Sequence, residues 1–284
     1  MSHPRPATVA EAANTSGGPL SDRHRPSGTQ FPPAPRGHRN RATWWVARSL
    51  VMLVLAGAVA FGVLLFVTPS ASEAVALVKA QATKHGTPYP GPNPPQRFTE
   101  ALVATEDQRF YSPFDPGVDP FAVGRAVLGQ MLAWGDEGGS TIDQQLAKLL
   151  YTPRRHSLSV KLERMVLALK LNFTYTKPEI LAMYAEIVYF GNGYYGLEAA
   201  SCGYFGRQPA DLTWAQAAML AGVLNAPSLY NPRIHPSLAQ QRQAHVFRRL
   251  VAVGALSEAQ AKAALSQPLD VVPAALRAVR SSCR

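Results

Sequence analysis

The stretch EGGSTIDQQLAKLL, from Glu137 to Leu150, has the pattern of a short helix that begins after a glycine pair. At about 100° per residue, one arc of this helix is apolar and the other carries Thr141, Gln144, Gln145 and Lys148. The polar arc holds hydrogen-bonding groups and one cation but no carboxylate, which suits a polyol or a phosphate. Ser140 and Asp143 have the spacing of a capping box, and Gly138-Gly139 would leave the backbone amides open to a ligand. The alternative is a capped surface helix with solvated glutamines.

The N-terminal part of the chain divides into a tail and an apolar run. Residues 1–43 are rich in Pro, Ser, Gly and Arg, which predicts a disordered basic tail. Ser49 to Val67 contain no charge and are long enough to cross a hydrocarbon core of about 30 Å, so we expect a membrane anchor over 44–67. Seven arginines against two acids precede Ser49, which predicts a single-pass anchor with a cytoplasmic N-terminus. A cleaved signal peptide is the alternative, disfavoured by the long charged leader.

The net charge and the two cysteines limit which classes of partner and site the sequence supports. Residues 49–284 carry a surplus of five basic over acidic side chains, which favours an anionic membrane surface or a phosphate-bearing substrate. Nucleic acid is disfavoured because no basic run is interleaved with aromatic residues. Cys202 and Cys283 lack metal-ligand spacing, and we expect a small core residue and a tail thiol.

Beyond the anchor, apolar residues recur at helical spacing in one segment after another. The proline-rich segment Thr87 to Gln96 closes an extracytoplasmic linker over 68–96, so we expect a folded domain over 97–270 and a basic tail over 271–284. No alternating strand intervenes, and the predicted fold class is therefore mainly α. The expected helices are 97–111, 119–134, 141–151, 157–173, 178–190, 213–224, 237–253 and 257–266.

The first of these helices carries an acidic pair near its end. Glu106 lies four residues after Leu102 and four before Phe110, so part of its flank is apolar. Such a carboxylate favours the role of a general base in a cleft. The alternative for Glu106 and Asp107 is two solvated acids at the end of a helix.

Five motifs, in their order along the chain, resemble those of a known protein family. They are ATEDQRFYS, PGVDP, GGSTIDQQLAK, KPEILAMYAEIVYFGNGYYGLEAASCGYFGR and LTWAQAAMLAGVLNAPSLYNP. In order and spacing this series resembles the peptidoglycan glycosyltransferase family, the transglycosylase module of bifunctional penicillin-binding proteins and of their monofunctional relatives. No S-x-x-K or K-T-G motif follows, so the monofunctional form is expected.

The resemblance implies a lysozyme-like, two-lobed helical domain that polymerises peptidoglycan from lipid II outside the bacterial cytoplasmic membrane. The growing glycan on polyprenyl pyrophosphate is the donor, and the sugar 4-hydroxyl of lipid II is the acceptor. A divalent cation, Mg²⁺ or Mn²⁺, shares the pyrophosphate charge, and other cell-wall synthesis proteins are potential partners. The apolar residues between 111 and 135 would form a membrane-dipping jaw: Phe114, Phe121, Leu128, Met131, Leu132 and Trp134.

The family's site residues carry over position by position. Glu106 would be the general base, and Lys148 would meet the leaving pyrophosphate. The remaining substrate-binding positions are Asp107, Phe110, Ser140, Thr141, Gln144, Gln145, Lys161 and Arg164.

The chain departs from the family pattern at several positions. Counted without gaps, Arg164 occupies the place of the second catalytic glutamate, with Glu163 one residue earlier. A π-bulge between Arg164 and Asn172 would restore the register, and we expect Glu163 to point toward Glu106 as the second catalytic carboxylate. Otherwise Arg164 becomes a second pyrophosphate ligand. The other departures are Asp115 near an expected His, Asp143 for Thr, His156 and Val160 for Arg, Asn172 for Glu and Glu186 for Asn.

Two other classes of function remain open. A lytic enzyme needs only one acid on the related fold. A catalytically weakened protein that binds lipid II or an assembly partner would tolerate a displaced glutamate.

Overall fold

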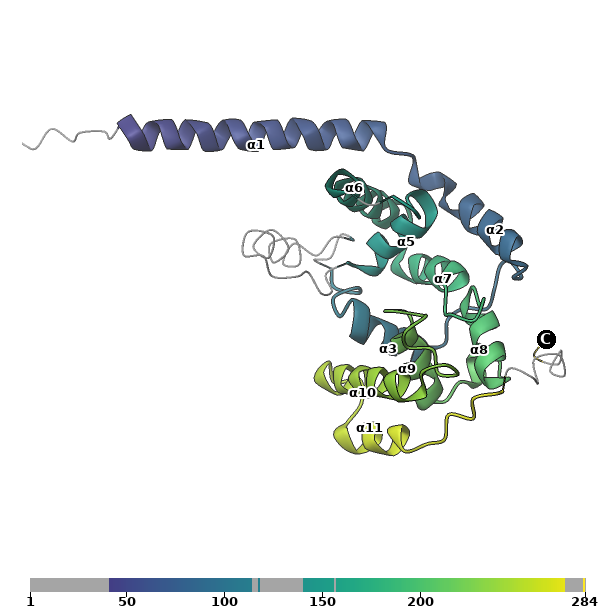
Figure 1. Ribbon diagram of the computed structural model, residues 1–284. Coiled ribbons are helices and arrows are strands. Elements are labelled where there is room, and N and C mark those ends of the chain that lie inside the picture. Colours follow the sequence, from purple (N-terminus) through teal and green to yellow (C-terminus); the bar gives the residue numbers. More distant parts are fainter. Residues whose placement is uncertain (1–40, 114–116, 118–139, 156, 274–282, 284) are drawn as a thin grey trace, which may run out of the picture. The chain divides into compact units, whose positions relative to one another are not determined.

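The computed structural model describes residues 41–113, 117, 140–155, 157–273 and 283 (Figure 1). Its first element is the long helix α1, Arg41–Val67, whose apolar side chains from Trp44 to Val67 are exposed apart from the partly buried Leu64. Among the described residues, one stretch, Thr43–His85, contains a segment long and apolar enough to cross a membrane. That finding rests on length and composition alone.

A short helical turn and one helix follow α1 in the segment that sequence patterns assign to a linker. The 3₁₀ turn η1 covers Ala71–Glu73, and α2 covers Ala74–His85 before Gly86 ends it in the left-handed conformation, with φ +70°. Ala74, Val78 and Ala82 recur every fourth residue and are buried where α2 packs on α7. The linker expected over 68–96 therefore contains a packed helix, and only the proline-rich part after His85 is extended.

Four of the remaining helices pack around one buried element. That element is α9, Trp214–Val223, which is apolar on every side and is packed between α3, Gln96–Glu106, and α10, Pro236–Ala252. Its alanines and Gly222 allow close approach, since a Cβ at Gly222 would lie 3.2 Å from Arg242 Cγ. The other elements are α5, Ile142–Tyr151; α6, Leu158–Thr174; α7, Lys177–Ile187; α8, Leu197–Phe205; η2, Pro209–Asp211; and α11, Glu258–Leu265.

The expected fold class is confirmed, because the regular elements of the described residues are all helices, and the β-structure among them is limited to one isolated bridge between Tyr189 and Tyr195. The helix expected over 97–111 ends earlier, at Glu106, because Asp107 leaves the helical region with φ −154°. The helix expected over 119–134, together with the jaw residues Phe114 to Trp134 and Asp115, lies outside the described residues, as does His156. The tail over 1–43 is described only from Arg41 onward, and α8 was not predicted.

The expectation about the two cysteines is wrong. Cys202 and Cys283 form a disulfide that joins α8 to the end of the chain, with 5.8 Å between their Cα atoms. The helix α6 is buried on one side only. Val160, Leu167 and Leu171 are buried, whereas Leu158 is 71% exposed and Leu162 is 44% exposed.

Candidate active site

The carboxylate of Glu106 lies where four helices meet. Glu106 is the last residue of α3, and its Oε2 accepts a hydrogen bond of 3.0 Å from Gln145 Nε2 on α5. Its Oε1 is 3.4 Å from the guanidinium of Arg242 on α10. Both side chains of this ion pair are mostly buried, at 13% and 16% exposed. Glu106 therefore has a fixed position and faces a neighbouring positive charge.

Tyr184 fixes the orientation of the Gln145 amide. The Tyr184 hydroxyl on α7 donates a 2.7 Å hydrogen bond to Gln145 Oε1, so the amide nitrogen must face Glu106. Burial, and then the nearby Glu106 carboxylate, raises the pKa of Tyr184 well above its ordinary value. The hydroxyl therefore remains a donor at physiological pH, and α7, α5 and α3 are joined by two consecutive hydrogen bonds.

Asp107 has a structural contact although it follows the candidate base directly. Its Oδ2 accepts the backbone N–H of Ile142 at 3.1 Å, which satisfies an open donor at the start of α5. The side chain is 7% exposed. Glu106 thus lies where the helices meet, whereas Asp107 joins the end of α3 to the beginning of α5.

The N-terminus of α5 differs from the predicted capping box. Thr141, not Ser140, is the N-cap, and its hydroxyl accepts from Gln144 N at 3.2 Å while donating to Gly117 O at 2.7 Å. Thr141 is buried and Ser140 is exposed. Thr141 therefore faces the protein interior and is not part of the exposed polar arc expected from the sequence.

Asp143 is fully buried in a network that the sequence did not reveal. Its Oδ2 pairs with Lys177 Nζ on α7 at 3.1 Å, and its Oδ1 accepts from Asn172 Nδ2 on α6 at 3.1 Å. Gly117 packs on this group so closely that a Cβ would lie 2.9 Å from Ala168 O and 3.1 Å from Asp143 Oδ1. The carboxylate thereby joins three helices and the Gly117 backbone.

Phe110 supports this network from the other side. Its ring is fully buried and lies 4.5 Å from the Lys177 ammonium, a cation–π contact. Its position makes Phe110 a packing residue in this conformation, although sequence patterns assign it to the substrate.

The basic residues expected to meet the pyrophosphate have different environments. Lys148 and Lys161 are exposed, and neither ammonium has an ion pair among the residues that the structure describes. Lys148 lies one turn after Gln145 and thus on the face of α5 that contacts Glu106. Gln144 is half-exposed on the same helix.

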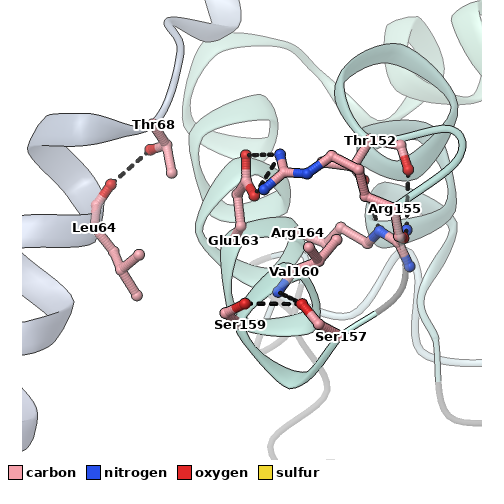
Figure 2. A network of polar contacts seen from close by, with 9 residues as sticks. All are labelled: Leu64, Thr68, Thr152, Arg155, Ser157, Ser159, Val160, Glu163 and Arg164. Carbon is pink, nitrogen blue, oxygen red and sulfur yellow. Dashed lines mark hydrogen bonds and ion pairs between the residues drawn. The ribbon is translucent and has the colours of Figure 1, made fainter.

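Glu163 and Arg164 both contact the loop before α6 (Figure 2). The Glu163 carboxylate pairs with Arg155 at 2.9 Å, and Arg164 donates from Nε to Thr152 Oγ1 at 2.7 Å and from Nη2 to the carbonyls of Thr152 and Arg155. Burial lowers the pKa of Arg164 from its ordinary value, although the adjacent Glu163 opposes this effect.

The expected orientation of Glu163 toward Glu106 does not match these contacts. Its side chain lies about 180° around α6 from Asn172, which binds α5, because nine residues separate the two positions. The helix is a continuous α-helix from Leu158 to Thr174, so no π-bulge shifts the register. The catalytic role of Glu163 therefore stays a prediction without a geometric contact to support it.

Sequence reasoning missed Arg242 and Tyr184. Arg242 lies beyond the quoted motifs, but it follows buried Ala239 by three residues and precedes buried Val246 by four. A cation inside an apolar stripe was therefore a usable signal. Tyr184 lies inside a quoted motif, but no spacing within that motif links it to Gln145.

No three of the His, Cys, Asp and Glu side chains converge in the part of the chain that the structure describes. These residues do not fit a protein-built cage for the divalent cation that the resemblance implies.

Comparisons with known proteins identify a family over most of the helical domain. The transglycosylase family model matches residues 74–251. Penicillin-binding protein 1A of Aquifex aeolicus is 40% identical over 178 residues, which cover 62% of this chain and 24% of that protein. A protein of Cupriavidus necator named as a transglycosylase is 38% identical over 175 residues, covering 62% of this chain and 75% of that protein. Penicillin-binding protein 1A of Haemophilus influenzae has a solved structure that covers 47% of this chain and 16% of its own, with 28% identity and a TM-score of 0.34. The matched region is thus about a quarter of the length of the first of these relatives.

Proposed function

Because this chain belongs to the transglycosylase family, we propose that it polymerises the glycan strands of peptidoglycan from lipid II. The donor is the growing glycan on polyprenyl pyrophosphate, and the acceptor is the 4-hydroxyl of the lipid II sugar. The helix α1 anchors the chain in the bacterial cytoplasmic membrane, with the N-terminus in the cytoplasm and the helical domain outside. Tethering brings the domain and its two lipid-linked substrates together in two dimensions.

In the proposed reaction Glu106 accepts the proton of the attacking hydroxyl. The acceptor oxygen forms a bond to the anomeric carbon of the donor while the bond from that carbon to the pyrophosphate oxygen breaks. The pyrophosphate leaves with the electron pair, and the anomeric centre inverts. Lys148 and Lys161, which have no ion pair among the described residues, offer positive charge to the leaving group.

The observation that carries the proposal is the position of Glu106 between Gln145 and Arg242. A proton acceptor needs a fixed geometry, and here both oxygens of the carboxylate are held by side chains from other helices. The amide of Gln145 is in turn held by Tyr184.

The divalent cation remains part of the proposal with the substrate as its main ligand. Pyrophosphate oxygens bind Mg²⁺ readily, and such ions are often held by substrate phosphates and one or two protein carboxylates. Titrating EDTA into the purified full chain before adding lipid II would measure this requirement.

Fluorescently labelled lipid II given to the purified full chain tests the proposal. Lipid-linked polymer supports it, with release of polyprenyl pyrophosphate. Shortening of preformed glycan, without polymer, would instead assign a lytic enzyme.

A lipid II-binding protein without turnover is the second candidate, and the pairing of Glu163 with Arg155 favours it because one catalytic carboxylate is displaced. Retention of lipid II without polymer or cleavage would replace our proposal with this one.

A further inference from the structure

An open pocket lies at the end of α8, away from the candidate active site. Its volume is about 560 Å³, which is within the usual range for pockets that bind small molecules. Arg97, in its lining, precedes Glu106 by nine residues on α3, so the two side chains leave that helix on opposite sides. The lining comes from the start of α3, the turn after α8, the 3₁₀ turn η2 and the end of the chain: Arg97, Gly206, Arg207, Gln208, Ala210, Asp211 and Cys283.

The pocket presents charged groups of both signs. Arg97 and Arg207 contribute two guanidinium groups, and Asp211 contributes a carboxylate. Arg97 donates from Nη1 to Leu212 O at 3.0 Å, which restricts where its guanidinium can lie. Arg207 is 3.9 Å from the carboxylate of Asp270, and both side chains of this pair are exposed. Such a long, exposed contact neutralises little of the charge of Arg207.

The disulfide completes the wall of this pocket. It holds Cys283 beside Cys202 of α8, and the side-chain amide of Gln208 donates to the carbonyl of Cys283. The preceding segment is fastened to the same helix, because Val272 N donates to Tyr204 O at 2.8 Å. Reduction would remove the covalent bond that keeps Cys283 in this wall.

The charges of the lining indicate which ligand fits. A guanidinium binds a carboxylate or a phosphate through two parallel hydrogen bonds. A carboxylate such as that of Asp211 repels a phosphate, but it accepts hydrogen bonds from an ammonium group or an amide N–H. A ligand that carries both kinds of group therefore matches the three charged side chains better than a simple anion does. Amino acids and short peptides with a free carboxyl end are such ligands.

We propose that this pocket binds the carboxyl end of a short peptide, and that the disulfide between Cys202 and Cys283 completes the site. Arg97 and Arg207 bind the terminal carboxylate, and Asp211 accepts from the ammonium group or a peptide N–H. The inference goes beyond the proposed function, because binding at this pocket needs neither lipid II nor Glu106.

Saturation-transfer NMR with the purified full chain in detergent tests the proposal. The probes are L-alanyl-L-alanine and its D,D enantiomer, and each is compared with its C-terminal amide, which lacks the carboxylate. We expect saturable binding of at least one dipeptide and at least tenfold weaker binding of its amide. Inorganic phosphate, added as a competitor, should bind at least tenfold more weakly than that dipeptide.

Variants locate the binding at this pocket. Arg207→Gln should weaken binding of the dipeptide at least tenfold, with little change in melting temperature because the side chain is exposed. Arg248→Gln, at an exposed site on α10, is the matched control and should bind like wild type. The double variant Cys202→Ser, Cys283→Ser should bind at least tenfold more weakly than wild type. If this double variant is unfolded, the comparison of Arg207→Gln with Arg248→Gln decides.

The proposal is overturned if neither dipeptide binds saturably to the oxidised wild-type chain. Equal affinities for the dipeptide and its amide, or for the dipeptide and phosphate, would also overturn it. Wild-type affinity in Arg207→Gln would place the binding elsewhere, and wild-type affinity in a folded double serine variant would refute the role of the disulfide. None of these measurements uses lipid II, so failure of the proposed function would leave their results unchanged.

Discussion

At the residue scale, Glu106 depends on side chains that the surrounding sequence does not display. Gln145 holds one oxygen of its carboxylate only because Tyr184 turns the amide, and Arg242 reaches the other oxygen from a helix 136 residues away. Local patterns located Glu106 and Gln145, because both lie in helices of strong periodicity. The cation of Arg242 inside an apolar stripe was a signal that its position is unusual, but no pattern could assign Arg242 or Tyr184 to this site, since a hydrogen bond between helices leaves no periodic signal.

Tyr184→Phe should lower kcat about 10-fold with little change in KM. The phenylalanine leaves Gln145 Oε1 without its hydrogen-bond donor, so the amide no longer has a fixed orientation toward Glu106. A rise of about 1.4 kcal/mol in the activation free energy corresponds to a tenfold lower rate. Steady-state kinetics with lipid II measure the effect. Tyr204→Phe is the control, because it removes another buried tyrosine hydroxyl, bonded to Phe190 O, far along the chain from Glu106. Equal losses in the two variants would assign Tyr184 to stability alone.

Glu163→Gln should retain a rate within about threefold of wild type, because the contacts of Glu163 are to the loop residue Arg155 and not to Glu106. A catalytic carboxylate would instead cost roughly 10² to 10⁴ in rate. Arg155→Gln removes the other partner of the same ion pair. This variant should have the same rate and melting temperature as Glu163→Gln. A loss of 10² or more in Glu163→Gln alone would restore the mechanism with two glutamates.

At the element scale, the sequence predicted where most helices lie but not the N-cap of α5, which is Thr141 and not Ser140. Apolar periodicity placed α5, α6, α9, α10 and α11 to within one or two residues. It missed α2, whose buried face consists of Ala74, Val78 and Ala82, too small to stand out beside a proline-rich segment. Asp143 was read as a helix cap because its partners, Asn172 and Lys177, come from two other helices.

Glu186 on α7 binds the extended segment before α3. Its Oε2 accepts from Gly91 N at 2.8 Å, and a Cβ at Gly91 would lie on this carboxylate. Burial raises the pKa of Glu186 above 4.5, opposed by the Gly91 hydrogen bond and assisted by Glu198. A carboxyl with a higher pKa in the folded chain binds its proton more tightly there, so its contribution to stability falls as pH rises through that pKa.

Glu186→Gln should therefore raise the melting temperature at neutral pH, because the amide oxygen still accepts from Gly91 while the buried charge is removed. The gain should disappear at about pH 3, more than a unit below the ordinary pKa, where Glu186 is protonated in both states. Thermal unfolding of the full chain in detergent at the two pH values measures this. Glu258→Gln, at an exposed site on α11, is the control. A variant that is less stable than wild type at neutral pH would contradict this explanation.

At the scale of the whole molecule, the anchor and the disulfide both bear on which side of the membrane the helical domain lies. The disulfide between Cys202 and Cys283 was not predicted, because two cysteines 81 residues apart carry no spacing signal. Disulfides persist in oxidising compartments, which agrees with a helical domain outside the cytoplasm.

Thiol trapping in cells should find both cysteines oxidised. Cells are quenched with acid, and the denatured chain is treated with a maleimide of high mass before and after reduction. We expect no mass shift before reduction and a shift of two labels after it. Two labels before reduction would place the domain on the reducing side and contradict the proposed orientation.

The rate of lipid II polymerisation by Glu106→Gln, measured beside its melting temperature, tests whether Glu106 is the general base. The substitution removes the proton acceptor but little volume, and the amide can still accept from Gln145. The account predicts a loss of roughly 10² to 10⁴ in rate with an unchanged fold. Wild-type rates in this variant would contradict the assignment of Glu106 as the general base.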